Sequence, residues 1–337
     1  MPATGYRYEF EKPIAELEHR LQEARKASDQ TASSRIKALE AEIEQLKRKI
    51  YGSLIPWNRV QLARHPQRPY TLDYVGKLFG EFVQLHGDRF FGEDRALVAG
   101  LGMFEGHSCI VLGHQKGRDT KENLMRNFGS PHPEGYRKAM RLMRMAEKYR
   151  RPIIVFIDTP GAYPGVGAEE RGQAHSIAYN LREMSGLKTP IYVCVIGEGG
   201  SGGALGIGLG DWVAILENAY YSVISPEGCA AILWRDRLRA PEASGALKLT
   251  AYDLLGMGIV DEVIEEPLGG AHNDPDIVAE RVRASILRFL KHAGTLSIDK
   301  LIQNRYEKFR RIGAVTTISA SSAEVPPSTT SATAPRE

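Results

Sequence analysis

The sequence predicts a layered α/β fold, and two near-repeated segments carry that prediction. RPIIVFIDTPGAYPGVGAEERGQ and TPIYVCVIGEGGSGGALGIG each contain a proline, a wholly apolar run, a glycine-rich turn and a helical stretch. Wholly apolar strands are typical of sheets that helices cover on both faces. A third round, WVAILENAYYSVISPEGCAAILWRD, predicts two short strands, a turn at 225–228 and another helix.

The chain before these repeats predicts a helical hairpin, a connection and a strand pair. Residues 13–50 carry isoleucine and leucine at alternating spacings of three and four, interrupted by SDQTASS. Two short arms with such a seam predict an antiparallel hairpin. Residues 51–75, rich in proline and aromatic side chains, are expected to wrap the surface as a connection. Residues 98–101 and 108–112, separated by FEGH, predict paired strands.

The remaining segments complete a three-part organisation. SPHPEGYRKAMRLMRMAEKYR predicts a helix whose methionine stripe packs in the core, and LLGMGIVDEVIEE predicts a helix end, a glycine turn and a short strand. Residues 275–312 predict amphipathic helices, and the Ser/Thr/Pro-rich end predicts a disordered tail. We therefore expect a helical hairpin over 1–55, one globular α/β domain over 56–312 and a disordered tail over 313–337.

Composition narrows the class of protein. The 337 residues are 42% hydrophobic and 25% charged, as in ordinary globular proteins, and a net charge of +3 does not predict nucleic-acid binding. Residues 116–151 carry a local charge of +7, which suits a phosphate-rich ligand or, equally, a solvated helix face. Cys109, Cys194 and Cys229 form no C-x-x-C pair, so neither a zinc ribbon nor a disulfide framework is predicted. With no signal peptide and no apolar run near ~18 residues, we expect a cytoplasmic protein without membrane partners.

The turn in GEGGSGGALGIGLGD fits three motifs. Gly197, Gly199 and Gly202 match a dinucleotide fingerprint, but the glycine-rich segment that follows disfavours the required helix, because Gly costs up to ~1 kcal/mol relative to Ala there. Gly199, Ser201 and Gly203 match a hydrolase nucleophile elbow, but no downstream acid and histidine are marked as its partners. The third interpretation is a turn that presents backbone N–H groups at a helix start.

A second small-residue turn supports that third interpretation. Pro160–Gly161–Ala162 and Gly202–Gly203–Ala204 follow neighbouring apolar strands, so they are expected to form walls of one cleft. Small side chains let a ligand approach the backbone, where two N–H groups can stabilise an oxyanion or an enolate. At this point the alternative, two tight turns with a purely structural role, stays open.

A long stretch of the chain resembles a known family. QKGRDTKENLMRNFGSPHPEGYRKAMRLMRMAEKYRRPIIVFIDTPGAYPGVGAEERGQ, the GEGGSGGALGIGLGD turn and YSVISPEGCAAILWRD are similar to the carboxyltransferase alpha subunit of bacterial and plastid-type acetyl-CoA carboxylase. PWNRVQLARHPQRPYTLDY resembles it too. The resemblance covers roughly residues 5–315 and leaves out the Ser/Thr-rich tail.

The resemblance implies a crotonase-like (ClpP/crotonase) spiral of ββα units. It implies transfer of a carboxyl group from carboxybiotin, held on a separate carrier protein, to acetyl-CoA to give malonyl-CoA. In the family the site lies between this subunit and a carboxyltransferase beta subunit in an α2β2 assembly, and the zinc ribbon belongs to the beta partner. Biotin carboxyl carrier protein and biotin carboxylase complete the implied set of partners.

The resemblance also implies roles for backbone groups. The Gly202–Gly203–Ala204 turn matches the oxyanion hole for the ureido oxygen of biotin, with Gly203 and Ala204 as the preferred N–H donors. Gly161, Ala162 and Tyr163 match the neighbouring wall of the cleft. The family needs no side-chain base, because the biotin anion itself removes the acetyl proton.

Three charged residues are further candidates on the same resemblance. Arg171 lies near a position that holds the substrate carboxylate in related transferases, although a surface salt bridge is an equal alternative. Lys116 and Arg118 are candidate phosphate or carboxylate contacts, with solvated loop charges as the alternative.

Two other functions stay open at this point. A stand-alone crotonase-type acyl-CoA hydratase or hydrolase would use the same turn, would act without a partner and would need a carboxylate base, for which Glu198 is the candidate. A non-enzymatic scaffold is suggested by the hairpin and the tail.

Overall fold

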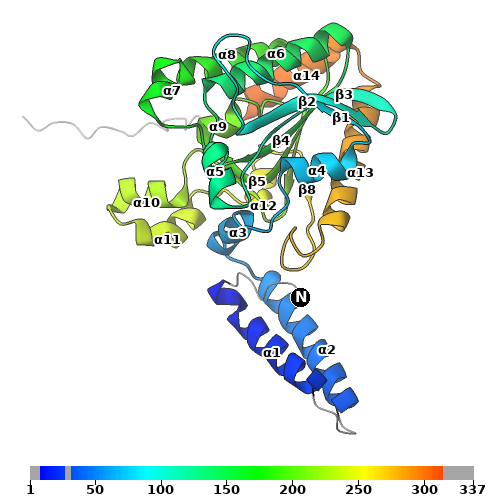
Figure 1. The fold of residues 1–337 in the computed structure, drawn as a ribbon, viewed down its shortest axis with the longest axis vertical. Coiled ribbons are helices and arrows are strands. Elements are labelled where there is room, and N and C mark those ends of the chain that lie inside the picture. The colour runs from blue at the N-terminus through cyan, green and yellow to red at the C-terminus, as the bar shows by residue number, and fades with distance from the viewer. Residues whose placement is uncertain (1–7, 27–31, 314–337) are drawn as a thin grey trace, which may run out of the picture.

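A mixed eight-stranded sheet forms the centre of the chain in a computed structural model that describes residues 8–26 and 32–313 (Figure 1). The strands are β1 (Phe82–Gln84), β2 (Leu97–Phe104), β3 (His107–His114), β4 (Ile153–Thr159), β5 (Ile191–Gly200), β6 (Trp212–Leu216), β7 (Tyr220–Ser222) and β8 (Glu262–Ile264). Their order is β1-β2-β3-β4-β5-β6-β8, with β7 paired to the end of β5. The predicted strand pair is confirmed, because β2 and β3 run antiparallel around the FEGH turn. From β3 to β8 the neighbouring strands are parallel.

Several helices begin where the sequence carries helix-start signals. The helices are α1 (Lys12–Lys26), α2 (Ala32–Tyr51), α3 (Pro56–Ala63), α4 (Thr71–Leu78), α5 (Thr120–Met125), α6 (Pro133–Tyr149), α7 (Val166–Glu170), α8 (Gln173–Gly186), α9 (Ser201–Leu205), α10 (Pro226–Trp234), α11 (Ala240–Ala246), α12 (Ala251–Gly256), α13 (Pro275–Ala293) and α14 (Ile298–Arg311). Ser225, Asp274 and Ser297 accept hydrogen bonds from backbone N–H groups in the first turns of α10, α13 and α14. Such caps satisfy N–H groups that have no partner within the helix.

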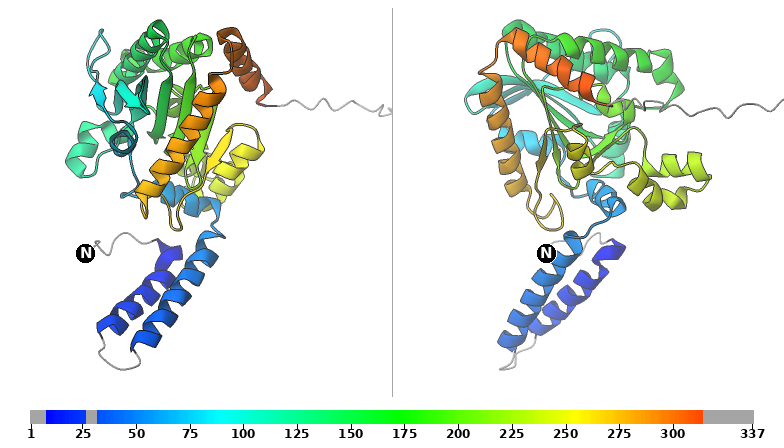
Figure 2. Two further views of the ribbon diagram at one scale, coloured as in Figure 1. Left: turned by 90° about the vertical axis from the view of Figure 1, so that its right-hand side faces the viewer. Right: turned by 180° about the vertical axis from the view of Figure 1, so that it is seen from behind.

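The sheet is covered on both faces, as its wholly apolar strands predict. Every residue of β4 and β5 is buried. Helix α6 packs on β2 and β3 with α8 beside it, while α4 and α13 pack together against the other side (Figures 1 and 2). On that side the ring of Tyr74 stacks on Phe156, and the ring of Phe289 contacts Tyr192. The methionine stripe of α6 lies in the core, with Met140 and Met143 buried.

The helical hairpin projects from the body (Figure 2). Helices α1 and α2 enclose an apolar cluster of their own, made by Leu17, Leu21, Ala24, Leu39 and Ile43. The Glu11 carboxylate joins the two ends of the hairpin, because it accepts hydrogen bonds from the Tyr51 hydroxyl (2.7 Å) and the Tyr8 N–H (2.9 Å). The predicted polar turn overlaps residues 27–31, which lie outside the described residues.

The prediction for residues 51–75 is wrong. This segment forms α3 and the start of α4 rather than a surface connection, and it contributes buried side chains such as Val60, Leu62 and Tyr74. Arg68 is buried as well, because both its terminal nitrogens pair with the Glu266 carboxylate at 2.6 and 2.9 Å. Proline-rich composition suggested an exposed connection, but Pro56 serves as the first residue of a helix.

Three remaining predictions concern the tail, the apolar segments and the three cysteines. Of the predicted tail, only Gly313 belongs to the described residues. Across 8–26 and 32–313, no helix combines the length and the apolarity that crossing a bilayer requires. Cys109 and Cys194 are free and buried, whereas Cys229 is partly exposed.

Candidate functional site

The two small-residue turns meet at one edge of the sheet. Strands β4 and β5 are parallel neighbours, so their carboxyl ends lie together, and Gly161–Ala162 follows β4 while α9 follows β5 directly. A Cβ atom at Gly203 would lie 2.6 Å from the Ala162 amide nitrogen and closer still to the Gly161 carbonyl carbon. A Cβ atom at Gly200 would lie 2.8 Å from the Thr159 oxygen. The two turns therefore pack backbone against backbone at this edge, and their role as two walls of one cleft stays a prediction.

The N–H groups at this edge come from the first residues of α9. In a regular helix the N–H groups of Ser201, Gly202 and Gly203 have no carbonyl partner within the helix. The N–H of Ala204, the fourth residue, donates to the Gly200 carbonyl in such a helix. Gly202 is partly exposed, while Gly203 and Ala204 are buried. Ser201 has a positive φ of 47°, which makes the change from strand to helix abrupt. Helix geometry thus favours Gly202 and Gly203 over Ala204 as N–H donors.

The serine of this turn is not part of a catalytic triad within the described residues. No hydrogen bond there joins the Ser201 hydroxyl to a histidine. The neighbouring His114 is fully buried at the end of β3, and its Nδ1 atom lies 3.4 Å from the Asp158 amide nitrogen that donates to it. The hydrolase interpretation therefore lacks its base.

A buried cluster of charges lies beneath the two turns. The Lys116 ammonium is 2.7 Å from Asp158 Oδ1 and 2.8 Å from Glu198 Oε1. The other Glu198 oxygen accepts hydrogen bonds from Arg64 Nε and the Tyr220 hydroxyl, each at 2.7 Å. Asp158 is not among the predicted site residues, although a single acid in the apolar run IIVFIDT is a signal that marks it. Lys116, predicted as a ligand contact, is instead engaged by protein carboxylates.

These contacts fix the protonation state of Glu198. Burial alone would raise the pKa of its carboxyl group, but the positive charges of Lys116 and Arg64 outweigh burial and lower the pKa to about 2. Burial likewise opposes the charge of Lys116, and Asp158 and Glu198 hold its pKa above the usual value. A carboxylate paired with two cations is a poor proton acceptor at neutral pH, because a general base needs a pKa near the working pH. Glu198 therefore does not fit the role of hydratase base.

Acid is expected to weaken the fold through His114. Burial lowers the pKa of this imidazole from 6.5 to about 3, so the folded chain keeps it neutral while the unfolded chain takes up a proton below about pH 6.5. The free energy of unfolding should then fall as pH drops from 6.5 towards 3, at up to about 1.4 kcal/mol per pH unit from this group. Urea unfolding between pH 7.5 and 5 measures that slope. His114→Gln should reduce it, and an unchanged slope in this variant would contradict the assignment.

Arg171 lines a separate cavity of about 400 Å³, and Tyr163 contacts a residue of its wall. Arg171 lines it together with Phe91, Asp94 and His132, and the Tyr163 ring stacks on His132 with centroids 4.2 Å apart. The Arg171 guanidinium is 2.7 Å from the Glu134 carboxylate and lies over the Phe91 ring. The structure thus places Arg171 in the salt bridge that the sequence left as an alternative.

Arg118 lies apart from the two turns. Its guanidinium pairs with Asp73, donates to the backbone oxygens of Pro66 and Arg68 at 3.0 Å, and stacks over the Tyr70 ring at 3.9 Å. These contacts join the loop after β3 to the start of α4. The structure therefore does not bring Arg118 together with Gly202 and Gly203.

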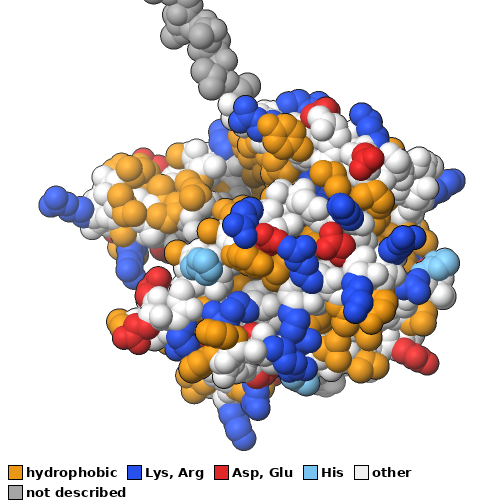
Figure 3. Space-filling model, turned by 90° about the horizontal axis from the view of Figure 1, so that it is seen from above, with side chains coloured by type: hydrophobic (Ala, Val, Ile, Leu, Met, Phe, Trp, Pro, Cys, Tyr) orange, Lys and Arg blue, Asp and Glu red, His pale blue; other side chains and the backbone are white. Residues whose placement is uncertain are grey.

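The basic excess of residues 116–151 is partly neutralised, because six of its eleven cations form ion pairs with carboxylates. Acids from other segments pair with Lys116, Arg118, Arg137 and Lys138, while Arg126 and Arg144 pair with Glu122 and Glu147 inside the segment. Figure 3 shows that Lys and Arg side chains on one face of the molecule are interspersed with acidic and hydrophobic ones. The local charge of +7 therefore does not form an uninterrupted basic surface on that face.

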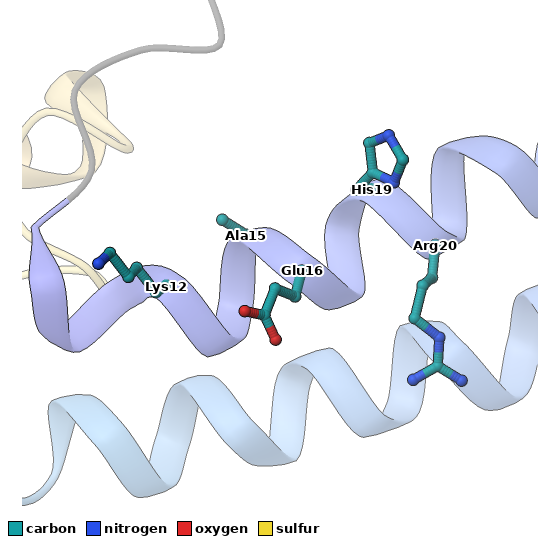
Figure 4. Close-up of a pocket in the computed structure, with 5 residues that line it drawn as sticks. All are labelled: Lys12, Ala15, Glu16, His19 and Arg20. Carbon is teal, nitrogen blue, oxygen red and sulfur yellow. The ribbon is translucent and has the colours of Figure 1, made fainter.

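Of two further hollows, one lies beside the α9 turn and the other lies on the helical hairpin. An apolar cavity of about 350 Å³ opens beside α9, and its walls include Ser201, Gly202, Leu205, Tyr221 and Val223. A hollow on the hairpin is lined by Lys12, Ala15, Glu16, His19 and Arg20, which all belong to α1 (Figure 4). Because a single helix lines it, this second hollow does not bring functional groups from different elements together.

The fold and the paired turns define a class of protein. The structure is similar to the transcarboxylase 12S core (TM-score 0.55, 21% identity, 68% of this chain and 42% of that one) and to a Pseudomonas malonate decarboxylase hetero-tetramer solved with coenzyme A (TM-score 0.54, 14% identity, 66% and 88%). The chain thus spans less than half of the transcarboxylase chain. Its fold is the mixed α/β fold of crotonase-like carboxyltransferases, as predicted.

Sequence comparison gives the family. Residues 7–313 match the model described as acetyl co-enzyme A carboxylase carboxyltransferase-like. The chain is 54% identical to the acetyl-coenzyme A carboxylase carboxyl transferase subunit alpha of Geobacter metallireducens, over 92% of this chain and 98% of that protein. It is also 54% identical to the subunit of the same name from Geobacillus kaustophilus, over 91% and 95%. The chain belongs to the family of acetyl-CoA carboxylase carboxyltransferase alpha subunits, and it is the carboxyltransferase component of that enzyme.

Proposed function

We propose that the two turns at the ends of β4 and β5 bind the ureido oxygen of carboxybiotin while its carboxyl group passes to acetyl-CoA. Carboxybiotin, on its carrier protein, supplies the carboxyl group, and malonyl-CoA is the product. The N–H groups of Gly202 and Gly203 stabilise negative charge on the oxygen, and Gly161 and Ala162 form the facing wall. The observation that carries this proposal is the backbone-to-backbone packing of the two turns.

The surroundings of the turns fit this use. Backbone N–H donors stabilise negative charge in the transition state only if they already point at the ligand oxygen. Their position must therefore be fixed before the reaction. The turns are held from below by Lys116, Asp158 and Glu198, all largely buried. The apolar cavity beside Ser201 and Gly202 provides room for an apolar part of the ligand. Tyr163 follows Ala162 in the loop after β4, so it stays a candidate for contact with the substrate.

A partner subunit is part of the proposal. Val223, Ile232, Leu233 and Leu238 are exposed on and around the α10–α11 arm, which extends from the body near α9 (Figure 1). Exposed apolar side chains that lie together are typical of surfaces that another protein covers. We assign this arm to contact with a carboxyltransferase beta subunit, in an α2β2 assembly that also works with biotin carboxyl carrier protein and biotin carboxylase. Zinc is proposed only for the beta subunit.

Reconstitution tests the proposal. The purified chain mixed with its zinc-containing beta subunit should transfer the carboxyl group of malonyl-CoA to biocytin, giving acetyl-CoA and carboxybiocytin, and the chain alone should not. A reconstituted pair without turnover would contradict the proposed reaction. Turnover of enoyl-CoA or acyl-CoA by the chain alone would instead support the stand-alone enzyme, which the pairing of Glu198 with Lys116 and Arg64 disfavours. Absence of binding to any CoA ester in calorimetry, even with the partner present, would favour a scaffold.

A further inference from the structure

The backbone ladder between β4 and β5 is interrupted just before the two turns. Ile157 pairs with Val195 and Thr159 pairs with Gly199, so the register shifts across Asp158. Between these pairs, β5 contains two more residues than β4. At such a bulge the ladder no longer fixes how the two strands lie relative to each other. Both turns begin within a few residues of this point, at Pro160 and Ser201.

Side chains connect the strands where the ladder is interrupted. Asp158 Oδ1 accepts a hydrogen bond from the Glu198 N–H at 2.9 Å, which links β4 to the bulged part of β5. The Lys116 ammonium reaches the same Asp158 oxygen at 2.7 Å and Glu198 Oε1 at 2.8 Å. One cation, carried by the segment after β3, thus bridges the two strands that end in the turns.

The bridge is shielded from solvent. The side chains of Lys116, Asp158 and Glu198 are 12%, 1% and 8% exposed. Charges in such an environment interact more strongly than on a surface, and removal of one partner leaves an uncompensated buried charge. The backbone that the bridge supports is closely packed, because the two turns contact each other at Gly200 and Gly203.

We propose that Lys116 is a positioning residue for carboxyl transfer, because its bridge between Asp158 and Glu198 sets the position of the α9 turn relative to the Gly161–Ala162 turn. The proposal rests on the proposed function, in which these turns bind the oxygen of carboxybiotin. It changes the role of Lys116 from a contact with ligand to a support for the groups that contact ligand. A displacement of about 1 Å in such a support can cost about 10²-fold in rate.

Lys116→Met in the reconstituted complex tests the proposal. Methionine keeps the side chain as far as the ε carbon and removes the ammonium group with its charge. We expect kcat for carboxyl transfer from malonyl-CoA to biocytin to fall about 10²-fold, with KM for malonyl-CoA within about twofold of the wild-type value. Amide hydrogen exchange should accelerate about tenfold or more in the segments 157–163 and 197–205.

Lys138→Met is the matched control, because it also removes a buried ammonium. Lys138 Nζ pairs with Glu93 at 2.5 Å and with the Asp94 carbonyl at 2.7 Å, and its side chain is fully buried. This variant should lose thermal stability, yet kcat and exchange in the two segments should stay within about twofold of wild type. Lys116→Arg, which keeps a cation between the carboxylates, should recover most of the lost kcat.

A double variant keeps the proposal testable if Lys116→Met folds poorly. Lys116→Met with Glu198→Gln removes the cation together with one of its anions, so less unpaired charge is buried. This variant should fold and assemble, and its kcat should remain low because the bridge is absent. Wild-type kcat in either folded variant, or equal losses in Lys138→Met, would overturn the proposal. If the wild-type complex itself lacks transfer activity, the proposed function fails, and the exchange experiment still tests whether Lys116 holds the turns.

Discussion

Gly203→Ala is expected to lower kcat of the reconstituted complex by about 10²–10³-fold, the usual cost of losing one oxyanion-hole donor. The added methyl group would lie 2.6 Å from the Ala162 amide nitrogen and nearer to the Gly161 carbonyl carbon. Both atoms are backbone, so the two turns must separate to admit it. The N–H group of Gly203 would then move away from the position that the ligand oxygen requires.

Neighbouring glycines make the measurement specific. At Gly202 the same methyl group would lie 3.4 Å from the end of the Ile177 side chain, which can move, so Gly202→Ala should cost much less activity. Gly76→Ala in α4 has no atom within 4 Å and controls for the substitution itself. Size-exclusion chromatography with the beta subunit checks assembly of each variant. Full activity of an assembled Gly203→Ala complex would remove the paired turns from the proposed site.

Arg68→Met is expected to lower the free energy of unfolding by about 3–5 kcal/mol, the typical loss when one partner of a buried ion pair is removed. Arg68 and Glu266 are 1% and 0% exposed, and they join the segment between α3 and α4 to the segment after β8. Arg68 Nε also donates to the Ile196 carbonyl at 2.6 Å. Without the guanidinium, the buried Glu266 carboxylate keeps, among the described residues, the N–H groups of Asn218 and Ala271 and the Asn218 side chain as partners.

Urea unfolding of the chain measures this loss. Adding Glu266→Gln to Arg68→Met should recover part of the stability, because glutamine keeps an acceptor for the backbone N–H groups and leaves no unpaired charge. A loss below about 1 kcal/mol in the single variant would mean that this pair contributes no more than an exposed one.

Features that depend on local pattern were predictable from the sequence. The apolar runs that became β4 and β5, the strand pair β2–β3 and the stripe of Met140 and Met143 all follow from periodicity and from the absence of polar residues. The meeting of the two turns was predictable as well, because neighbouring parallel strands end at one edge. The glycines then indicated where backbone approaches backbone.

Features that depend on distant partners were not predictable in the same way. Lys116 lies 42 residues from Asp158 and 82 residues from Glu198, so nothing near it in the sequence shows that its charge is buried. Arg68 and Glu266 are 198 residues apart, and without that pairing the segment 51–75 resembles a polar surface connection. For Arg118 and Arg171, likewise, only the structure reveals the carboxylates of Asp73 and Glu134. Charged residues were therefore the least well assigned part of the candidate site.

The helical hairpin has a thermodynamic consequence of its own. Its apolar cluster is separate from the core of the sheet, and the buried Glu11–Tyr51 contact ties its two ends together close to the body. A structural unit that shares few contacts with its neighbour opens and closes independently of it. We therefore expect the hairpin to open with a smaller free energy than the sheet, so that amide hydrogen exchange in α1 and α2 is faster than in β4 and β5.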